Sequence, residues 1–126
     1  MKQTILAVDD SKAIRFLLQS IFEKKYKIVT AADASSAMYW LSRKNIPQLI
    51  ITECQLPDVD NWEFVANLKN SFLYQPVPVI VLSSQESPEI QSKCKTYGID
   101  YFFPKPFNPV ELIELVDELL SKEKIY

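Results

Sequence analysis

Polar and charged side chains stand within two residues of the ends of four short apolar segments of this chain. They are Asp9 and Asp10 after residues 4–8, Glu53 after 48–52, Ser83 and Ser84 after 77–82, and Lys105 after 99–103. Short apolar runs favour buried β-strands, and the functional cleft of an open α/β sheet lies beyond the carboxyl ends of its strands. We therefore expect these acids, hydroxyls and lysine to converge at one edge of a sheet and form a site.

The predicted cluster has the chemistry of phosphoryl transfer. Asp9, Asp10 and Glu53 offer the clustered oxygen ligands that suit Mg²⁺, for which we expect weak binding. Lys105 could hold a phosphoryl oxygen by charge, and Ser83 could hold one by a hydrogen bond. A simpler interpretation stays open, in which Glu53 is a structural ion-pair partner of Lys105. The pattern thus indicates phosphoryl chemistry on a carboxylate, or a relic of it.

The rest of the chain alternates between strand-like and helix-like segments. The strand-like runs are 4–8, 26–31, 48–52, 77–82 and 99–103. The helical stripes are Ile14, Leu17, Leu18, Ile21 and Phe22; Ala34, Ala37, Met38 and Leu41; Trp62, Val65 and Leu68; and Leu112, Leu115, Val116 and Leu119. Five strands alternating with five helices predict an α/β domain with a parallel sheet covered on both faces.

Start and stop signals support this division into elements. Ser11 can cap the first helix, and Ser87-Pro88 and Asn108-Pro109 are typical of the first residues of two later ones. The fourth helix is expected to run toward Gly98, the only glycine in the chain.

Composition excludes several classes of function. The chain has 126 residues, of which 48% are hydrophobic and 24% charged, which fits one globular domain. It has no histidine, so histidine-based zinc sites and Ser-His-Asp triads are excluded. A net charge of -2 gives no field that favours nucleic acid or an anionic membrane. With no signal peptide and two cysteines at no metal or redox spacing, we expect a cytoplasmic protein with reduced thiols.

Four motifs, in order along the chain, resemble those of one family. They are "ILAVDDS" from residue 5, "PQLIITECQLPDVDNWEF" from 47, "VPVIVLSS" from 77 and "YGIDYFFPKPF" from 97. Over essentially its whole length the chain resembles the receiver domain of two-component response regulators. The resemblance implies one receiver domain over residues 1–126 and a flavodoxin-like sheet with strand order 2-1-3-4-5.

The resemblance also implies roles for individual residues. Asp9 and Asp10 match the acidic metal-binding pair, and the backbone carbonyl of Gln55 matches a further metal ligand. Ser83 matches the switch hydroxyl and Phe102 the switch aromatic. Lys105 matches the phosphate-contacting lysine, and its bond to Pro106 matches the family's cis peptide.

Glu53 stands where the family has its phospho-accepting aspartate. The extra methylene of glutamate moves the carboxylate by roughly an ångström, and such a misplacement can cost on the order of 100-fold in rate. Asn61 replaces the usual glycine, and Gln48 replaces the usual acid. We therefore expect phosphorylation of Glu53 to be weak or absent.

The functional hypothesis is a non-enzymatic receiver that relays a signal by protein–protein contact. Its implied partners are a downstream target and, if phosphorylation is retained, a sensor histidine kinase or phosphotransfer protein, with neither nucleic acid nor membrane among them. The alternative is a phosphorylation-independent pseudo-receiver that acts as an interaction or scaffold module. A flavodoxin is disfavoured because Asp9 and Asp10 would repel a bound phosphate. A haloacid-dehalogenase-type phosphatase is disfavoured because its two aspartates are not adjacent.

Overall fold

One parallel sheet of five strands organises the chain, in the order β2-β1-β3-β4-β5. The structure is a computed structural model, and it describes residues 2–84 and 88–122. The strands are β1 (Thr4–Val8), β2 (Lys27–Ala31), β3 (Leu49–Glu53), β4 (Val79–Ser83) and β5 (Tyr101–Pro104). The helices are α1 (Lys12–Phe22), α2 (Ala34–Ser42), α3 (Glu63–Asn70), α4 (Pro88–Tyr97) and α5 (Pro109–Lys122). The predicted fold class and strand order are confirmed.

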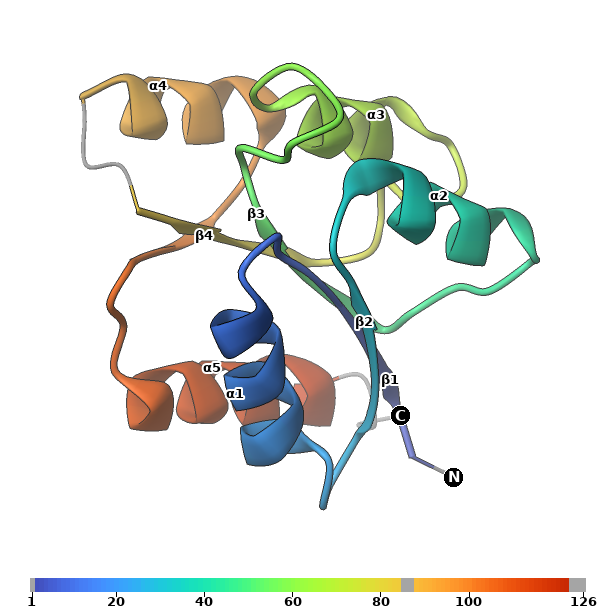
Figure 1. Cartoon of the computed structure of the whole chain (residues 1–126), viewed down its shortest axis with the longest axis vertical. Helices are drawn as coiled ribbons and strands as arrows, with labels where there is room; N and C mark the ends of the chain where they lie inside the picture. Colours follow the sequence, from blue (N-terminus) through green and yellow to red (C-terminus); the bar gives the residue numbers. More distant parts are fainter. Residues whose placement is uncertain (1, 85–87, 123–126) are drawn as a thin grey trace.

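Helices cover both faces of the sheet. Figure 1 shows α1 and α5 together on one face and α2, α3 and α4 on the other. Alternate residues of each strand therefore enter two separate cores. In β1, Leu6 and Val8 pack toward α2 and α3, whereas Ile5 and Ala7 pack toward α1 and α5. Burial on both faces explains the almost unbroken apolar sequence of the central strands.

The predicted helix starts are confirmed where the structure describes them. The Ser11 hydroxyl accepts a hydrogen bond from the Ile14 amide, and Asn108 Oδ1 accepts one from the Val110 amide. Pro88 is the first residue of α4, as expected, while Ser87 lies outside the described residues. Gly98 follows α4 with a φ of 68°, a left-handed conformation that glycine adopts without a steric penalty.

Three expectations about the elements were inaccurate. Trp62 belongs to a predicted helical stripe, yet α3 begins at Glu63 and Trp62 precedes it in a left-handed conformation. Met38 belongs to the predicted apolar stripe of α2, yet its side chain is 39% exposed, so only Ala34, Ala37 and Leu41 of that stripe are buried. β3, β4 and β5 each begin and end one or two residues later than predicted. Because of this shift, Glu53 and Ser83 are the last residues of their strands and do not lie in the loops that follow.

No helix within residues 2–84 and 88–122 is long and apolar enough to cross a membrane.

Candidate functional site

The sheet brings the predicted site residues to the carboxyl ends of four adjacent strands. Asp9 follows β1, Glu53 ends β3, Ser83 ends β4, and Lys105 follows β5. The chain reverses its strand order at β1, which pairs with both β2 and β3. A cleft at such a switch point is the usual place for a functional site in this class of sheet.

Lys105 lies between two buried carboxylates. Its Nζ is 2.6 Å from Asp9 Oδ2 and 2.9 Å from Glu53 Oε1. The side chains of Asp9, Glu53 and Lys105 are 1%, 5% and 13% exposed, so water screens the charges little. The predicted ion pair between Glu53 and Lys105 is confirmed. We call Asp9, Glu53 and Lys105 the ion triad.

The second oxygen of Glu53 is also engaged. Oε2 accepts hydrogen bonds from the backbone amides of Cys54 at 2.8 Å and Gln55 at 3.2 Å. The Cys54 thiol lies 3.5 Å from the same oxygen and donates to it. Protein donors thus hold both oxygens of the Glu53 carboxylate.

Asp9 is fixed by its own local contacts. Its Oδ1 accepts a hydrogen bond from the Ser11 amide at 2.9 Å, just before α1 begins. Its buried Oδ2 forms an ion pair with the Lys105 ammonium. The geometry of this contact is too poorly aligned for a hydrogen bond. Burial raises the pKa of the Asp9 carboxyl, although Lys105 opposes this shift.

Two effects act in opposite directions on the pKa of the Lys105 ammonium. Burial alone would lower its pKa, because a charged group loses hydration in the interior. The contacts with Asp9 and Glu53 outweigh burial and raise the pKa. Lys105 is therefore a permanent cation at neutral pH.

The remaining predicted residues surround the ion triad. Ser83 is fully buried, its carbonyl accepts the Lys105 amide at 2.9 Å, and its side chain hydrogen-bonds to the Cys54 thiol. Phe102 is half-buried on the core side of α4, opposite to Tyr101 and Phe103. The Lys105–Pro106 peptide bond is cis, as expected.

The acids of the site are poorly arranged for a divalent cation, which needs several oxygen ligands around one point. Asp10 is exposed, and within residues 2–84 and 88–122 no three acidic or cysteine side chains are grouped to hold a metal. The buried Asp9 Oδ2 would be a suitable ligand, but the Lys105 ammonium already neutralises it. As arranged, the site does not fit Mg²⁺, and metal binding would require Lys105 to move.

Sequence reasoning missed three residues near the site. Cys54 contacts Glu53 directly, and burial raises the pKa of its thiol to about 11. Asp58 accepts hydrogen bonds from the amides of Ala34 and Ser35 at the start of α2. Trp62 has a φ of 70°, rare for a bulky residue, and stacks on Tyr97 of α4. Only the turn sequence around Asp58 carried any local signal of such a role.

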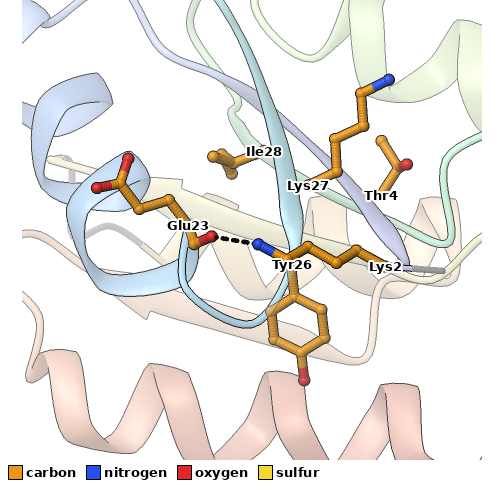
Figure 2. Close-up of a pocket in the computed structure, with 6 residues that line it drawn as sticks. All are labelled: Lys2, Thr4, Glu23, Tyr26, Lys27 and Ile28. Atoms are coloured by element: carbon orange, nitrogen blue, oxygen red, sulfur yellow. Dashed lines mark hydrogen bonds between the residues drawn. The ribbon is translucent and has the colours of Figure 1, made fainter.

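Two of the pockets on the described residues lie at opposite edges of the sheet. Figure 2 shows the larger one, of about 590 Å³, whose lining residues Thr4 and Lys27 begin β1 and β2, so it lies far from the ion triad. Lys2 crosses it and donates to the carbonyl of Glu23 at 3.0 Å. A smaller pocket of about 160 Å³ adjoins the site and includes Gln55 and Trp62. The larger pocket contains none of the predicted site residues.

Comparisons with known proteins agree on one family. The family model for the response regulator receiver domain matches residues 5–117. Response regulator Rre1 of Synechocystis sp. is 30% identical over 123 residues, which are 96% of this chain and 53% of that protein. Two-component response regulator ORR6 of Oryza sativa subsp. japonica is 30% identical over 118 residues, which are 91% and 69% of the two chains.

A solved structure gives the same result for the fold. Chemotaxis response regulator CheY4 of Vibrio cholerae superposes with a TM-score of 0.83 and 29% identity, covering 94% of this chain and 99% of that one. The chain spans about half the length of the Synechocystis relative.

Proposed function

The chain belongs to the response regulator receiver family of two-component signalling, and from this premise we propose that it relays a signal without efficient phosphorylation of Glu53. The observation that carries the proposal is the buried contact of Glu53 with Lys105. A carboxylate that accepts a phosphoryl group needs one oxygen free to attack phosphorus in line. Here Lys105 holds Oε1 and two backbone amides hold Oε2.

Electrostatics add to this obstacle. The ion triad carries two carboxylates and one ammonium, and the exposed Asp10 adjoins it. A phosphodonor arrives with negative charge, which this surplus of acid repels. Because the arrangement does not fit a divalent cation, that repulsion would be left without compensation.

We further propose that Glu53 is a standing, partial imitation of a phosphorylated acceptor. Its longer side chain reaches Lys105 with no phosphate present. The imitation is partial, because a phosphoryl group has three acceptor oxygens and nearly two charges. A tenfold shift between two conformations requires about 1.4 kcal/mol, which one charge-assisted hydrogen bond could supply. A downstream target protein would then bind the chain constitutively.

Two finer possibilities fit this proposal. In the first, a sensor histidine kinase or phosphotransfer protein still acts on the chain weakly. In the second, the chain is a pseudo-receiver that works as an interaction or scaffold module and takes no phosphoryl group. The ion triad favours the second, because Lys105 already contacts both buried carboxylates before any reaction occurs.

Acetyl phosphate with Mg²⁺ tests the proposal when the products are read by intact mass. Wild-type protein should gain no phosphoryl mass. Glu53→Asp should gain one phosphoryl group, as the aspartate oxygen bonds to phosphorus, the bond from phosphorus to the acetyl oxygen breaks, and acetate leaves. Glu53→Gln is the matched control and should gain none. Robust labelling of wild-type Glu53 would contradict the proposal and indicate an ordinary regulator with an unusual acceptor.

A further inference from the structure

Two long stretches of the sequence contain no acidic residue. Residues 34–52 and 64–85 lack both Asp and Glu, although the chain has 16 of them and a net charge of -2. The charged side chains in these stretches are Arg43, Lys44 and Lys69. An acidic protein therefore has two stretches in which every formal charge is positive.

The fold places the two stretches side by side. The connection from α2 to β3 and the connection from α3 to β4 lead into neighbouring strands, where Ile50 donates its amide to the Pro78 carbonyl at 3.0 Å. The Tyr74 hydroxyl, in the second connection, donates to the Leu41 carbonyl of α2 at 2.9 Å. Figure 1 shows both connections on the same side of the molecule, away from the carboxyl ends of the strands.

Exposed apolar side chains concentrate on this region. Among the described residues seven large hydrophobic side chains are exposed, and five of them lie on α2 or in the two connections. These five, which we call the α2 patch, are Met38, Tyr39, Ile46, Phe72 and Leu73. Phe72 is fully exposed. Exposed apolar groups gathered in this way mark interaction surfaces, whereas scattered ones do not.

Two cations adjoin the α2 patch, Arg43 by contact and Lys44 along the chain. Arg43 stacks over the Tyr39 ring, with Cζ 5.7 Å from the ring centroid, and donates to its hydroxyl at 2.9 Å. The exposed Lys44 is the next residue along the chain. Lys69 donates to the carbonyls of Gln75 and Val77 and feels the charge of Asp100, so it adds less to the field.

We propose that the α2 patch docks a protein segment with an apolar face flanked by acidic residues, such as an amphipathic helix rich in leucine and glutamate. Tyrosine, phenylalanine, methionine and arginine are the residue types enriched in interface cores. The adjoining Arg43 and Lys44 select an acidic partner through charge complementarity. This docking does not depend on the proposed role of Glu53, which lies at the other edge of the sheet.

Other occupants fit less well. A two-fold dimer through the α2 patch would bring the same positively charged surface of both copies together, and like charges repel. Anionic membranes are recognised by clusters of roughly four to eight basic residues, more than this region offers. A protein segment needs fewer cations, because apolar contacts supply most of the affinity.

The test uses a fluorescein-labelled amphipathic peptide, with leucine at positions a and d of each heptad and glutamate at the flanking positions. Fluorescence anisotropy at low salt should show saturable binding to the whole chain, and binding should weaken only modestly as salt is raised, because apolar contacts supply most of the affinity. Phe72→Ser and Arg43→Glu should each weaken binding about tenfold or more. Amide shifts in NMR spectra should be confined to α2 and the two connections.

Matched controls come from the opposite face of the sheet. Phe16 on α1 is 75% exposed and Lys12 on the same helix is exposed, so Phe16→Ser and Lys12→Glu should leave binding unchanged. Unchanged melting temperatures would show that all four variants fold. Absence of saturable binding, equal binding of a scrambled peptide, or equal losses in the controls would overturn the proposal. Binding of phosphatidylserine vesicles or self-association in place of the peptide would overturn it too.

Discussion

Replacing Lys105 with methionine should expose how much the fold depends on the ion triad. Methionine keeps most of the apolar length of lysine and removes only the ammonium. Asp9 and Glu53 would then face each other as buried carboxylates without a counter-ion, 1% and 5% exposed. The backbone amides that bind Glu53 Oε2 and Asp9 Oδ1 would remain, so the local backbone has no separate reason to change.

The expected loss of stability is large. Removing one partner of a buried ion pair destabilises proteins by about 3–5 kcal/mol, because an uncompensated charge is left behind. Because Lys105 is only 13% exposed, solvent screening does not reduce this figure much. The free energy of unfolding of a domain of this size is about 5–15 kcal/mol, so the variant should lose a substantial part of its total stability. The midpoint in urea should fall by about 2 M.

Urea unfolding followed by circular dichroism measures this loss, and a second substitution tests its cause. Asp9→Asn in the Lys105→Met background removes one of the two repelling charges and should recover at least half of the loss. Lowering the pH should also recover part of the loss. Burial raises the pKa of Asp9, so this carboxylate takes up a proton and loses its charge more readily as the pH falls. Lys12→Met, at an exposed lysine of α1, is the control and should stay within about 0.5 kcal/mol of wild type.

A loss below about 1 kcal/mol in Lys105→Met would refute this reasoning, since it would mean that water or a small shift solvates the carboxylates at little cost. If Lys105→Met loses the expected stability and adding Asp9→Asn recovers none of it, methionine disturbs packing and charge is not the cause.

Three other outcomes follow from the site. A Mg²⁺ titration followed by Trp62 fluorescence should give no saturable change in wild type. It should give a saturable change in Glu53→Asp, because the shorter side chain is pulled away from Lys105. The reverse result would contradict the metal argument. Cys54 should react slowly with a thiol reagent in the native state at pH 8, since burial raises its pKa to about 11, and quickly in urea. Backbone hydrogen bonds lower the pKa of Asp58, so its contribution to stability is present above its unfolded pKa, about 3.9, and is lost as the pH falls through the lower folded value. The difference in melting temperature between wild type and Asp58→Ala should therefore shrink from pH 6 to pH 2, and a constant difference would mean that the charge of Asp58 contributes nothing.

The sequence predicted the fold well because its strongest signals are local and repeated. Buried strands leave short apolar runs, and helix starts leave Ser11, Pro88 and Asn108-Pro109 in the expected places. The convergence of Asp9, Glu53 and Lys105 followed from topology alone, because parallel strands end at one edge of the sheet. Met38 was misassigned because helical periodicity places a residue on a face but does not say how far the neighbouring layer extends.

The features that sequence reasoning missed depend on contacts between distant segments. Trp62 adopts a left-handed conformation that glycine usually provides, and nothing in its local sequence announces it. Its indole is buried against Tyr97 of α4, and its amide donates to the Cys54 carbonyl at 2.7 Å. Tertiary packing thus holds a backbone conformation that propensity alone would reject. The sequence showed an absent glycine at Asn61, but it could not show which neighbour would take over the unusual backbone geometry.

Asp58 links the loop after Glu53 to α2 by hydrogen bonds. Its two carboxylate oxygens accept the amides of Ala34 and Ser35, while Asp33 caps the same helix through the Ser36 amide. Two acids therefore satisfy three of the amide groups that a helix start leaves without partners, and both favour the positive end of the helix dipole. The far half of α2 carries Met38 and Tyr39 of the α2 patch. Since a helix of nine residues moves as a rigid rod, any displacement of the Asp58 loop that kept these bonds would also displace the patch. A single short helix thus joins the carboxylate site at one edge of the sheet to the basic, apolar surface at the other.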